Sequence, residues 1–430
     1  MLKKTTKKLE DEKFVSRYTN GKKNVFFSRN RKLPFKKLII LIGRGLSRSL
    51  QRELDTFSKE VLGAQFNIRE VTKGAFSQAR AKLKPEAFKE LNADAVDIFY
   101  QDAPYQVWHG HRLLAVDGTR LMLPRHKSVI QEFGEHGFGP NADSKRSMAM
   151  ASFLYDPVNL LTLDAQIVPY ASSERELLYQ HLQYVKAGDV LLLDRGYPGL
   201  GLFFLLKAKK IGFCVRMKDD WWLAVKDFKD SGKQESLVEF ALPKKDRELL
   251  KGYPKMHHQK ITCRLVLIEL DNGEKEVLCT SLTDSNKYTH EDIKELYHFR
   301  WNIEEGYKLF KSRIEVEDFS GKTAIAVKQD FYAKVYMMTM CAILAFPIEE
   351  KVKKEHEAEK QKYQSKINRT SALANYRDIM VGIFIRRMYR PALEAFDNIV
   401  KKTTEIIRPG RLLPRNHRTK KQYHMNYKKL

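Results

Sequence analysis

Two apolar runs that each end in an aspartate are the feature that most constrains how this chain can fold. His111–Asp117 reads His-Arg-Leu-Leu-Ala-Val-Asp, and Val190–Asp194 reads Val-Leu-Leu-Leu-Asp. Short apolar runs bounded by turn residues are typical of strands that are buried on both faces of a sheet. Two further runs, Met148–Leu154 and Leu160–Val168, predict a hairpin around Asp156-Pro157.

Helical segments alternate with these strands. Ser173-Glu-Arg-Glu176 has the pattern of a capping box and predicts the start of a helix. Pro198 suits the first position of the next helix, Phe213–Met217 predicts another strand, and a single helix is expected from about His290 to Arg313. The alternation predicts an α/β fold in which helices pack on a mixed sheet.

The length of 430 residues suggests two or three domains. Shifts in composition and pattern indicate a basic, mainly helical N-terminal part at 1–108, a split α/β core at 109–218 and 289–345, a separate β-rich insertion at 219–288, and a helical C-terminal part with a basic tail at 346–430. Within the insertion, Asp271-Asn272-Gly273 predicts the turn of a hairpin. A long functional or disordered loop is expected from Arg125 to Ser147.

The charge of the chain points to a polyanionic partner. Lys and Arg number 78 and Asp and Glu number 53, which gives a formal net charge of +25. The excess is concentrated in two stretches without an acid, with twelve Lys or Arg at 13–52 and eight at 408–430. Each neutralised phosphate releases a condensed counterion, so we expect a nucleic acid. A solvated basic tail and attraction to an anionic membrane are the alternatives.

Other features narrow the class of protein. Four scattered cysteines without a CxxC pair argue against a disulfide framework and fit a reducing cytoplasm. The longest apolar run, Val335–Ile348, is too short to span a bilayer and predicts a buried helix, so no membrane association is expected. A helix over Val71–Arg80 either points Ser77, Gln78 and Arg80 at DNA or is an ordinary surface helix.

Asp117 and Asp194 are the first candidates for a site. Side chains at the ends of buried strands open onto a crevice, where sites in α/β sheets usually lie. Arg195 to Pro198 form a turn into a predicted helix, whose N-terminus suits a phosphate. The alternative is that each aspartate is only a turn residue or a helix cap. Asp164 and Asp189 are weaker candidates, because they lie inside a hairpin strand and in the turn before a strand.

The third element is the helix that carries Glu304. At about 100° per residue, Tyr297, Arg300, Glu304 and Lys311 fall within an arc of about 60°, and Lys308 lies beside them. The opposite face holds the apolar residues Leu296, Phe299, Ile303 and Phe310. Convergent carboxylates can bind divalent cations, and neighbouring Arg and Lys can bind phosphates. An exposed helix face with an Arg300–Glu304 ion pair is the alternative.

The pattern Tyr297-x2-Arg300-x3-Glu304-x6-Lys311 resembles the YREK signature of bacterial insertion-sequence DDE transposases. Asp117 and Asp194, in their strand-end settings, resemble the first two acids of that family. The resemblance implies an RNase H-like core and a Mg²⁺-dependent reaction with two ions, for which Mn²⁺ substitutes. Asp117, Asp194 and Glu304 would be both the catalytic residues and the metal ligands. The resemblance implies DNA contacts by Tyr297, Arg300 and Lys311. The neighbouring positions suggest further contacts by Lys308 on the same helix, by Arg195 after Asp194, and by Trp221 and Trp222 in the insertion.

The resemblance also implies the partners and the reaction. The expected substrates are double-stranded DNA with terminal inverted repeats and a target DNA, cut and joined by a homodimer assembled on the DNA. The expected location is the bacterial cytoplasm, at the nucleoid when DNA is bound. Two alternatives remain: a domesticated nuclease that cuts without joining, and a catalytically inactive DNA-binding regulator of transposition. For Trp221 and Trp222, burial in the small core of the insertion is the alternative to stacking on a DNA base.

Overall fold

The computed structural model describes residues 1–20, 27, 31–137, 145–218, 222–270, 273–358 and 363–407. Its contacts divide the chain into two compact units. Unit 1 contains Met1–Ala103, Leu121–Ala149 and Lys308–Leu430, and unit 2 contains Pro104–Arg120 and Met150–Tyr307. The boundaries fall inside strand β1, strand β3 and helix α12, so each unit is described by itself.

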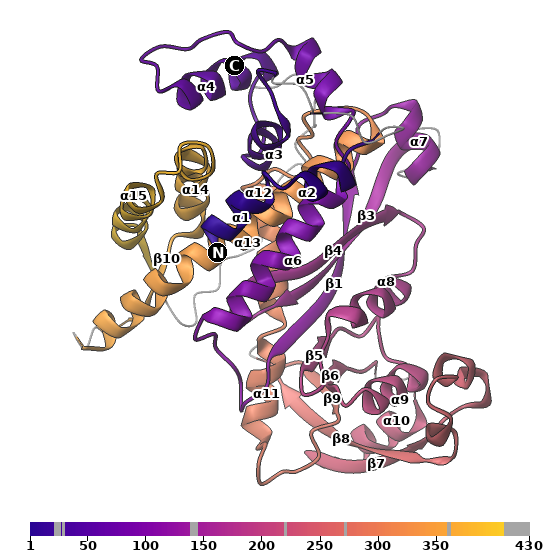
Figure 1. The fold of residues 1–430 in the computed structure, drawn as a ribbon. Helices are drawn as coiled ribbons and strands as arrows, with labels where there is room; N and C mark the ends of the chain where they lie inside the picture. Colours follow the sequence, from indigo (N-terminus) through magenta and orange to yellow (C-terminus); the bar gives the residue numbers. More distant parts are fainter. Residues whose placement is uncertain are drawn as a thin grey trace. The chain divides into compact units, whose positions relative to one another are not determined.

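Among the described residues, nine strands form one mixed sheet (Figure 1), with the order β2-β3-β1-β5-β6-β9-β8-β7 and with β4 paired to β3. Strand β5 lies between β1 and β6 and is parallel to both. The four residues Val190–Leu193 of β5 are fully buried, which explains why this run is purely apolar. The predicted α/β class with a mixed sheet is thus confirmed. The strands are β1 (Leu113–Met122), β2 (Glu135–Gly137), β3 (Lys145–Asp156), β4 (Leu161–Pro169), β5 (Val190–Leu193), β6 (Gly212–Arg216), β7 (Glu235–Ala241), β8 (Lys260–Glu269) and β9 (Lys275–Thr280).

The β-rich insertion is not a separate sheet, contrary to the sequence prediction. Strand β9 pairs antiparallel with β6, with Cys214 opposite Thr280, and β8 and β7 follow in the same sheet. Without β9, the edge of β6 would expose unpaired backbone N–H and C=O groups. The predicted hairpin between β8 and β9 is confirmed, although Asp271 and Asn272 of its turn lie outside the described residues.

The helices of unit 2 differ from the predictions mainly at their ends. They are α8 (Glu174–His181), α9 (Leu200–Ala208), α10 (Leu223–Asp230), α11 (His290–His298) and the first part of α12 (Trp301–Ser312). Helix α9 begins after Gly199, so Pro198 lies in the preceding turn and not at the first helical position. Ser173 precedes α8 without forming a side-chain capping bond.

The single helix expected from His290 to Arg313 is broken into α11 and α12. Phe299 and Arg300 form a turn in which the Arg300 N–H donates to the Tyr297 carbonyl at 3.1 Å. The Ile303 N–H likewise donates to the Arg300 carbonyl at 3.2 Å, so the chain here follows the tighter 3₁₀ pattern. The rotation per residue therefore changes at this point, and the predicted exposed face is wrong for Tyr297 and Arg300, which are both buried.

Unit 1 is built mainly from helices. They are α1 (Leu2–Lys8), α2 (Glu12–Arg17), α3 (Phe35–Gly43), α4 (Leu50–Leu62), α5 (Lys73–Arg80), α6 (Glu86–Asp102), α7 (Lys127–Phe133), α13 (Ala324–Ala358), α14 (Arg369–Phe384) and α15 (Tyr389–Lys402), with the short strands β10 (Ser365–Ile367) and β11 (Thr404–Ile406). Helix α13 lies along α6 (Figure 1) and also packs against α3, α14 and α15. Helix α7 and strand β2 occupy part of the segment that was expected to be a loop.

Helix α13 carries the apolar run noted in the sequence. Its length and composition would allow it to cross a membrane, but 78% of its most apolar window is buried inside the protein. The prediction of a buried helix is therefore confirmed.

Arg80 at the end of α5 is also buried in unit 1, and its guanidinium pairs with Asp330 and donates to the Gln329 side chain at 2.6 Å. The prediction that Arg80 faces DNA is wrong, because α13 already holds its charge.

Candidate active site

The candidate site begins at two adjacent aspartates in unit 2. Strands β1 and β5 are paired in parallel register, with Val116 opposite Leu193. Asp117 is the next residue of β1, which continues to Met122 and so does not end at this acid as the sequence predicted, and Asp194 directly follows β5. Neighbouring strands lie about 4.8 Å apart. Burial, together with the negative charges of Asp194 and Glu174, raises the pKa of Asp117 to about 6. The sheet therefore brings together the two acids that the sequence analysis selected.

Helix α12 is attached to this part of the sheet by three hydrogen bonds. The buried Tyr307 hydroxyl donates to the Asp117 carbonyl at 2.6 Å and accepts from the Phe153 N–H at 3.1 Å. The Asn302 amide donates to the Pro157 carbonyl at 2.8 Å. Glu304 lies about one turn before Tyr307 on the same helix, and its carboxylate is paired with Arg300.

Arg300 provides positive charge among the three acids. It is 4% exposed, and its guanidinium donates to Glu304 Oε1 at 3.0 Å. The charges of Asp194, Glu304 and Asp117 all favour its protonated form, and its pKa is raised despite burial. The alternative that Arg300 and Glu304 form an ion pair is thus correct, but the pair lies inside the site and not on an exposed face.

A further acid, Glu174, was missed by the sequence analysis. It is the first residue of α8, and its carboxyl group lies close to Gly118, where an added Cβ would come within 2.6 Å of Glu174 Oε1. Burial and the charge of Asp194 raise the pKa of Glu174. In sequence, a glutamate that caps a helix looks the same as a glutamate that belongs to a site. Glu174 is recognised only because α8 lies close to β1 in the structure.

The acids and their surroundings fit a divalent cation. Asp194 Oδ1 is a buried oxygen with no hydrogen-bond partner among the described residues, and burial is the main cause of the raised pKa of Asp117. Hard oxygen ligands of this kind suit Mg²⁺. Among the described residues, no three acidic, His or Cys side chains converge closely enough to bind a metal in this conformation. Glu304 is paired with Arg300 instead.

The remaining predicted DNA contacts lie in different surroundings. Tyr297 is buried, and its hydroxyl and Arg300 Nε have no hydrogen-bond partner among the described residues. Arg195 is exposed directly after Asp194. Lys308 is exposed and Lys311 half-buried on the last part of α12, within unit 1, where burial lowers the pKa of Lys311. Their roles toward DNA stay predictions.

The structure describes only one of the two tryptophans of the insertion. Trp221 lies outside the described residues. Trp222 is half-buried and makes edge-to-face contacts with Phe203 and Phe240, at centroid distances of 5.5 and 5.2 Å. These contacts support the packing alternative for Trp222, since its ring already packs against two aromatic side chains of the protein.

Two other groups of polar residues in unit 2 are structural. His181 shares hydrogen bonds with Ser152 Oγ at 3.0 Å and with Asp164 Oδ2 at 2.8 Å, an order that resembles a serine-hydrolase triad. All three residues are at most 4% exposed, so a substrate has no access to the serine. Asp189 is likewise held in a buried pair with Arg112, at 2.5 Å. Both weaker candidates from the sequence therefore have structural partners.

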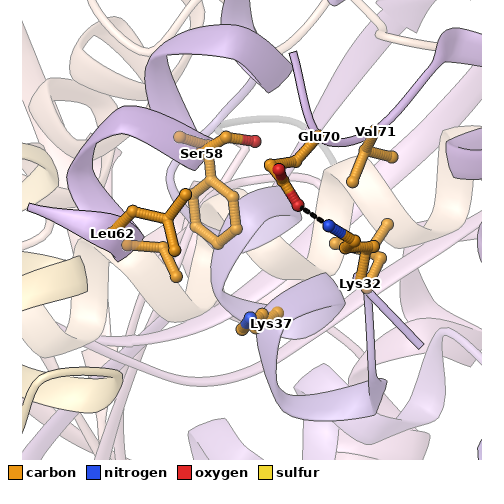
Figure 2. Close-up of a pocket in the computed structure, with 9 residues that line it drawn as sticks. Lys32, Lys37, Ser58, Leu62, Glu70 and Val71 are labelled. Atoms are coloured by element: carbon orange, nitrogen blue, oxygen red, sulfur yellow. Dashed lines mark hydrogen bonds and ion pairs between the residues drawn. The ribbon is translucent and has the colours of Figure 1, made fainter. Parts of the chain in front are cut away.

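Unit 1 contains a pocket with a different chemistry (Figure 2). Lys32 and Glu70 form an ion pair at its edge, and apolar side chains make up most of its wall. The lining residues are Lys32, Leu33, Lys37, Phe57, Ser58, Val61, Leu62, Glu70 and Val71. The charge of Lys32 is neutralised by its partner, and the lining lacks the paired acids that phosphoryl transfer needs. The carboxylate site in unit 2 is therefore the stronger candidate.

Comparison with known proteins identifies the class to which this fold and site belong. Residues 108–341 match the family described as the transposase DDE domain. This match spans more than half of the chain and includes Asp117, Asp194, Glu174 and Glu304, so the chain belongs to the DDE transposases.

The relatives are consistent with a bacterial insertion-sequence enzyme. Transposase InsG for insertion sequence element IS4, from Escherichia coli (strain K12), is 25% identical over 292 residues, which are 67% of this chain and 64% of that protein. The chain thus spans less than two thirds of that relative's length. The predicted resemblance to bacterial insertion-sequence DDE transposases is confirmed. A cryo-EM structure of a piggyBac transposase synaptic complex with hairpin DNA has a TM-score of 0.48 and 10% identity, covering 93% of this chain and 85% of that chain.

Proposed function

We propose that this chain cleaves DNA at the ends of an insertion sequence and joins the freed ends to target DNA, with divalent cations held by Asp117, Asp194 and Glu304. The observation that carries the proposal is that Asp117 on β1 and Asp194 directly after β5 follow Val116 and Leu193, which are buried and paired in two parallel strands. Helix α12, which carries Glu304, is hydrogen-bonded to Asp117 through Tyr307. Membership of the DDE transposases supplies the reaction class. The likeness to an insertion-sequence transposase supports the element end as substrate.

The residues of the site suggest how the work is divided. A bound pair of Mg²⁺ ions would supply Lewis-acid activation of water or a 3′-hydroxyl and neutralise charge at the phosphodiester. Asp117 and Asp194, which are carried by the sheet, would hold the cations. Arg300 orients Glu304 and carries a fixed positive charge beside the acids, where the phosphate would lie.

Exposed cations around the site would bind the DNA backbone. Arg195 follows Asp194, and Arg120 lies on β1, three residues after Asp117. Arg175, on the first turn of α8, donates to the Gly196 carbonyl at 3.0 Å, which places it beside the same turn. Contacts of this kind position DNA without reading its sequence. Tyr297, Lys308 and Lys311 would add contacts near the cleaved end, and a homodimer would hold two ends together.

A cleavage and joining assay tests the proposal. The substrate is the DNA that flanks the gene, including any short terminal inverted repeats, incubated with the full chain and Mg²⁺ and then with EDTA. We expect strand cleavage at the repeat and covalent joining to a target plasmid, both abolished by EDTA. Cleavage without joining would favour the nuclease alternative, and binding without cleavage in Mg²⁺ or Mn²⁺ would favour the inactive regulator.

Substitution of Glu304 separates a role in chemistry from a role in DNA binding. Glu304→Gln should abolish cleavage and leave binding of the DNA end within about twofold, because the change removes a cation ligand and not a phosphate contact. Glu305→Gln, on the exposed side of the same turn, is the matched control and should cleave normally. Equal loss of binding and cleavage in Glu304→Gln would contradict the assigned role.

A further inference from the structure

Glu174 lies in the candidate site although no sequence motif selects it. It is the first residue of helix α8. A Cβ added to Gly118 would be 2.6 Å from Glu174 Oε1, and one added to Gly196 would be 4.0 Å from Oε2. Gly118 directly follows Asp117, and Gly196 is two residues after Asp194. The carboxyl group of Glu174 therefore lies close to the backbone that follows Asp117 and to the backbone that follows Asp194.

The guanidinium of Arg300 donates to Glu304, and Asp194 Oδ1 is buried without a hydrogen-bond partner among the described residues. Carboxylates gathered at one buried place repel one another. A cation between them would remove this repulsion.

The buried hydroxyl of Tyr197 gives independent support for a ligand at this place. Its side chain is 2% exposed, and its hydroxyl has no hydrogen-bond partner among the described residues. Burial raises the pKa of this phenol, and the nearby charges of Glu174, Asp117 and Asp194 add to the rise. A buried hydroxyl without a partner is unfavourable by about 1–3 kcal/mol. Water held by a cation among the three acids would accept or donate the hydrogen bond that the protein does not provide.

We propose that Glu174 is a fourth acidic residue of this site, which binds a divalent cation together with Asp117 and Asp194 before DNA is present, with Tyr197 hydrogen-bonded to water in the cation's shell. This inference rests on the proposed function and adds a residue to its site. Because Glu304 is occupied by Arg300 in the free chain, Glu174 is the acid that completes the first cation site. The three carboxyl groups close on the cation as it neutralises their repulsion.

Binding of Mn²⁺ to the full chain without DNA tests this proposal. Bound Mn²⁺ loses the sharp electron paramagnetic resonance signal of the free ion, so the affinity is measured without any catalytic readout. Glu174→Gln should weaken Mn²⁺ binding by about 10- to 100-fold, as the loss of a coordinating or shell residue does. Glu176→Gln is the matched control, because Glu176 lies exposed on the same turn of α8, and it should bind as the unaltered chain does. Tyr197→Phe should weaken binding by about 2- to 10-fold.

The outcomes distinguish this proposal from the proposed function. Unchanged Mn²⁺ affinity in Glu174→Gln, with loss of binding in Asp117→Asn, would overturn the role of Glu174 and leave the proposed function intact. Unchanged affinity in both Asp117→Asn and Asp194→Asn would overturn the cation site itself. Absence of Mn²⁺ binding by the unaltered free chain would also overturn the proposal, because it requires a site assembled before DNA arrives. A circular dichroism melt of each variant shows that it is folded.

Discussion

Asp117 links the chemistry of the site to the stability of the chain. Its pKa is raised from 3.8 to about 6 by burial and by neighbouring carboxylates. Between these values the folded chain keeps a proton that the unfolded chain has lost. The free energy of unfolding therefore falls as pH rises through this range, and it stays lower above the folded pKa.

Asp117→Asn should consequently stabilise the cation-free chain near neutral pH. Asn keeps the acceptor for the Gly118 N–H, which donates to Asp117 Oδ1 at 2.8 Å, but carries no charge. We expect a gain of about 1–3 kcal/mol at about pH 8 that disappears below about pH 4. Urea unfolding in EDTA at several pH values measures it, with Asp227→Asn on α10 as an exposed-helix control. A gain that is the same at all pH values would contradict the pKa of Asp117 as its cause.

A bound cation should restore part of the stability that the chain loses when Arg300 is replaced. Its guanidinium is buried among Asp117, Asp194 and Glu304, so Arg300→Met should destabilise the chain by about 3 kcal/mol in EDTA. Divalent cations bound by the same acids should restore part of this loss. Urea unfolding with and without Mg²⁺ measures the difference, and Lys294→Met on the exposed side of α11 is the control. An identical loss in EDTA and in Mg²⁺ would contradict the view that guanidinium and cation neutralise the same charges.

At the scale of elements, α8 is attached to the sheet by a buried side chain. His181 connects it to Ser152 on β3 and to Asp164 on β4. His181→Ala leaves both groups without their partner and opens a cavity, so the free energy of unfolding should fall by about 2–4 kcal/mol. Urea denaturation measures this, with Gln180→Ala on the exposed face of α8 as the control. A fall of less than about 1 kcal/mol would show that α8 is attached by other contacts.

The elements also show where sequence patterns are sufficient. Apolar runs with turn residues at their ends predict β1 and β5, because burial on both faces of the sheet selects apolar residues along the run. The β8–β9 hairpin is predicted because its turn contains Gly273. The break between α11 and α12 leaves no Pro or Gly at Phe299–Arg300, so a continuous helix was expected. It arises because α12 is fixed to Asp117 and Pro157 by Tyr307 and Asn302. Such long-range contacts are invisible to periodicity.

The same distinction applies to the site. Asp117 and Asp194 could be found from sequence because each follows an apolar run that is buried in the sheet, although β1 continues past Asp117 to Met122. The parallel register of β1 and β5 then places the two acids on neighbouring strands. Glu174 could not be found from sequence, because its membership depends on how closely α8 approaches Gly118. The burial of Tyr297 and Arg300 was also missed, since the helical wheel assumed an unbroken helix. Site residues carried by the sheet are thus easier to predict than those carried by packed helices.

At the scale of the whole molecule, the net charge of +25 should control binding to DNA more than any one contact does. The stretch 408–430 carries eight Lys or Arg and no acid, and it lies outside the described residues. Deleting it should flatten the plot of log binding constant against log salt concentration by up to about 7, because each phosphate contact contributes about 0.9.

The matched control for this deletion replaces the eight basic residues by Gln and keeps the length of the chain. Both variants should lose slope equally on DNA of any sequence, measured by fluorescence anisotropy over a range of salt concentrations. Their affinity for Mn²⁺ should equal that of the unaltered chain, because the carboxylate site lies within unit 2. An unchanged slope would show that the stretch is a solvated tail. A slope lost only on deletion would mean that the stretch acts through its length or shape, because charge alone would affect both variants.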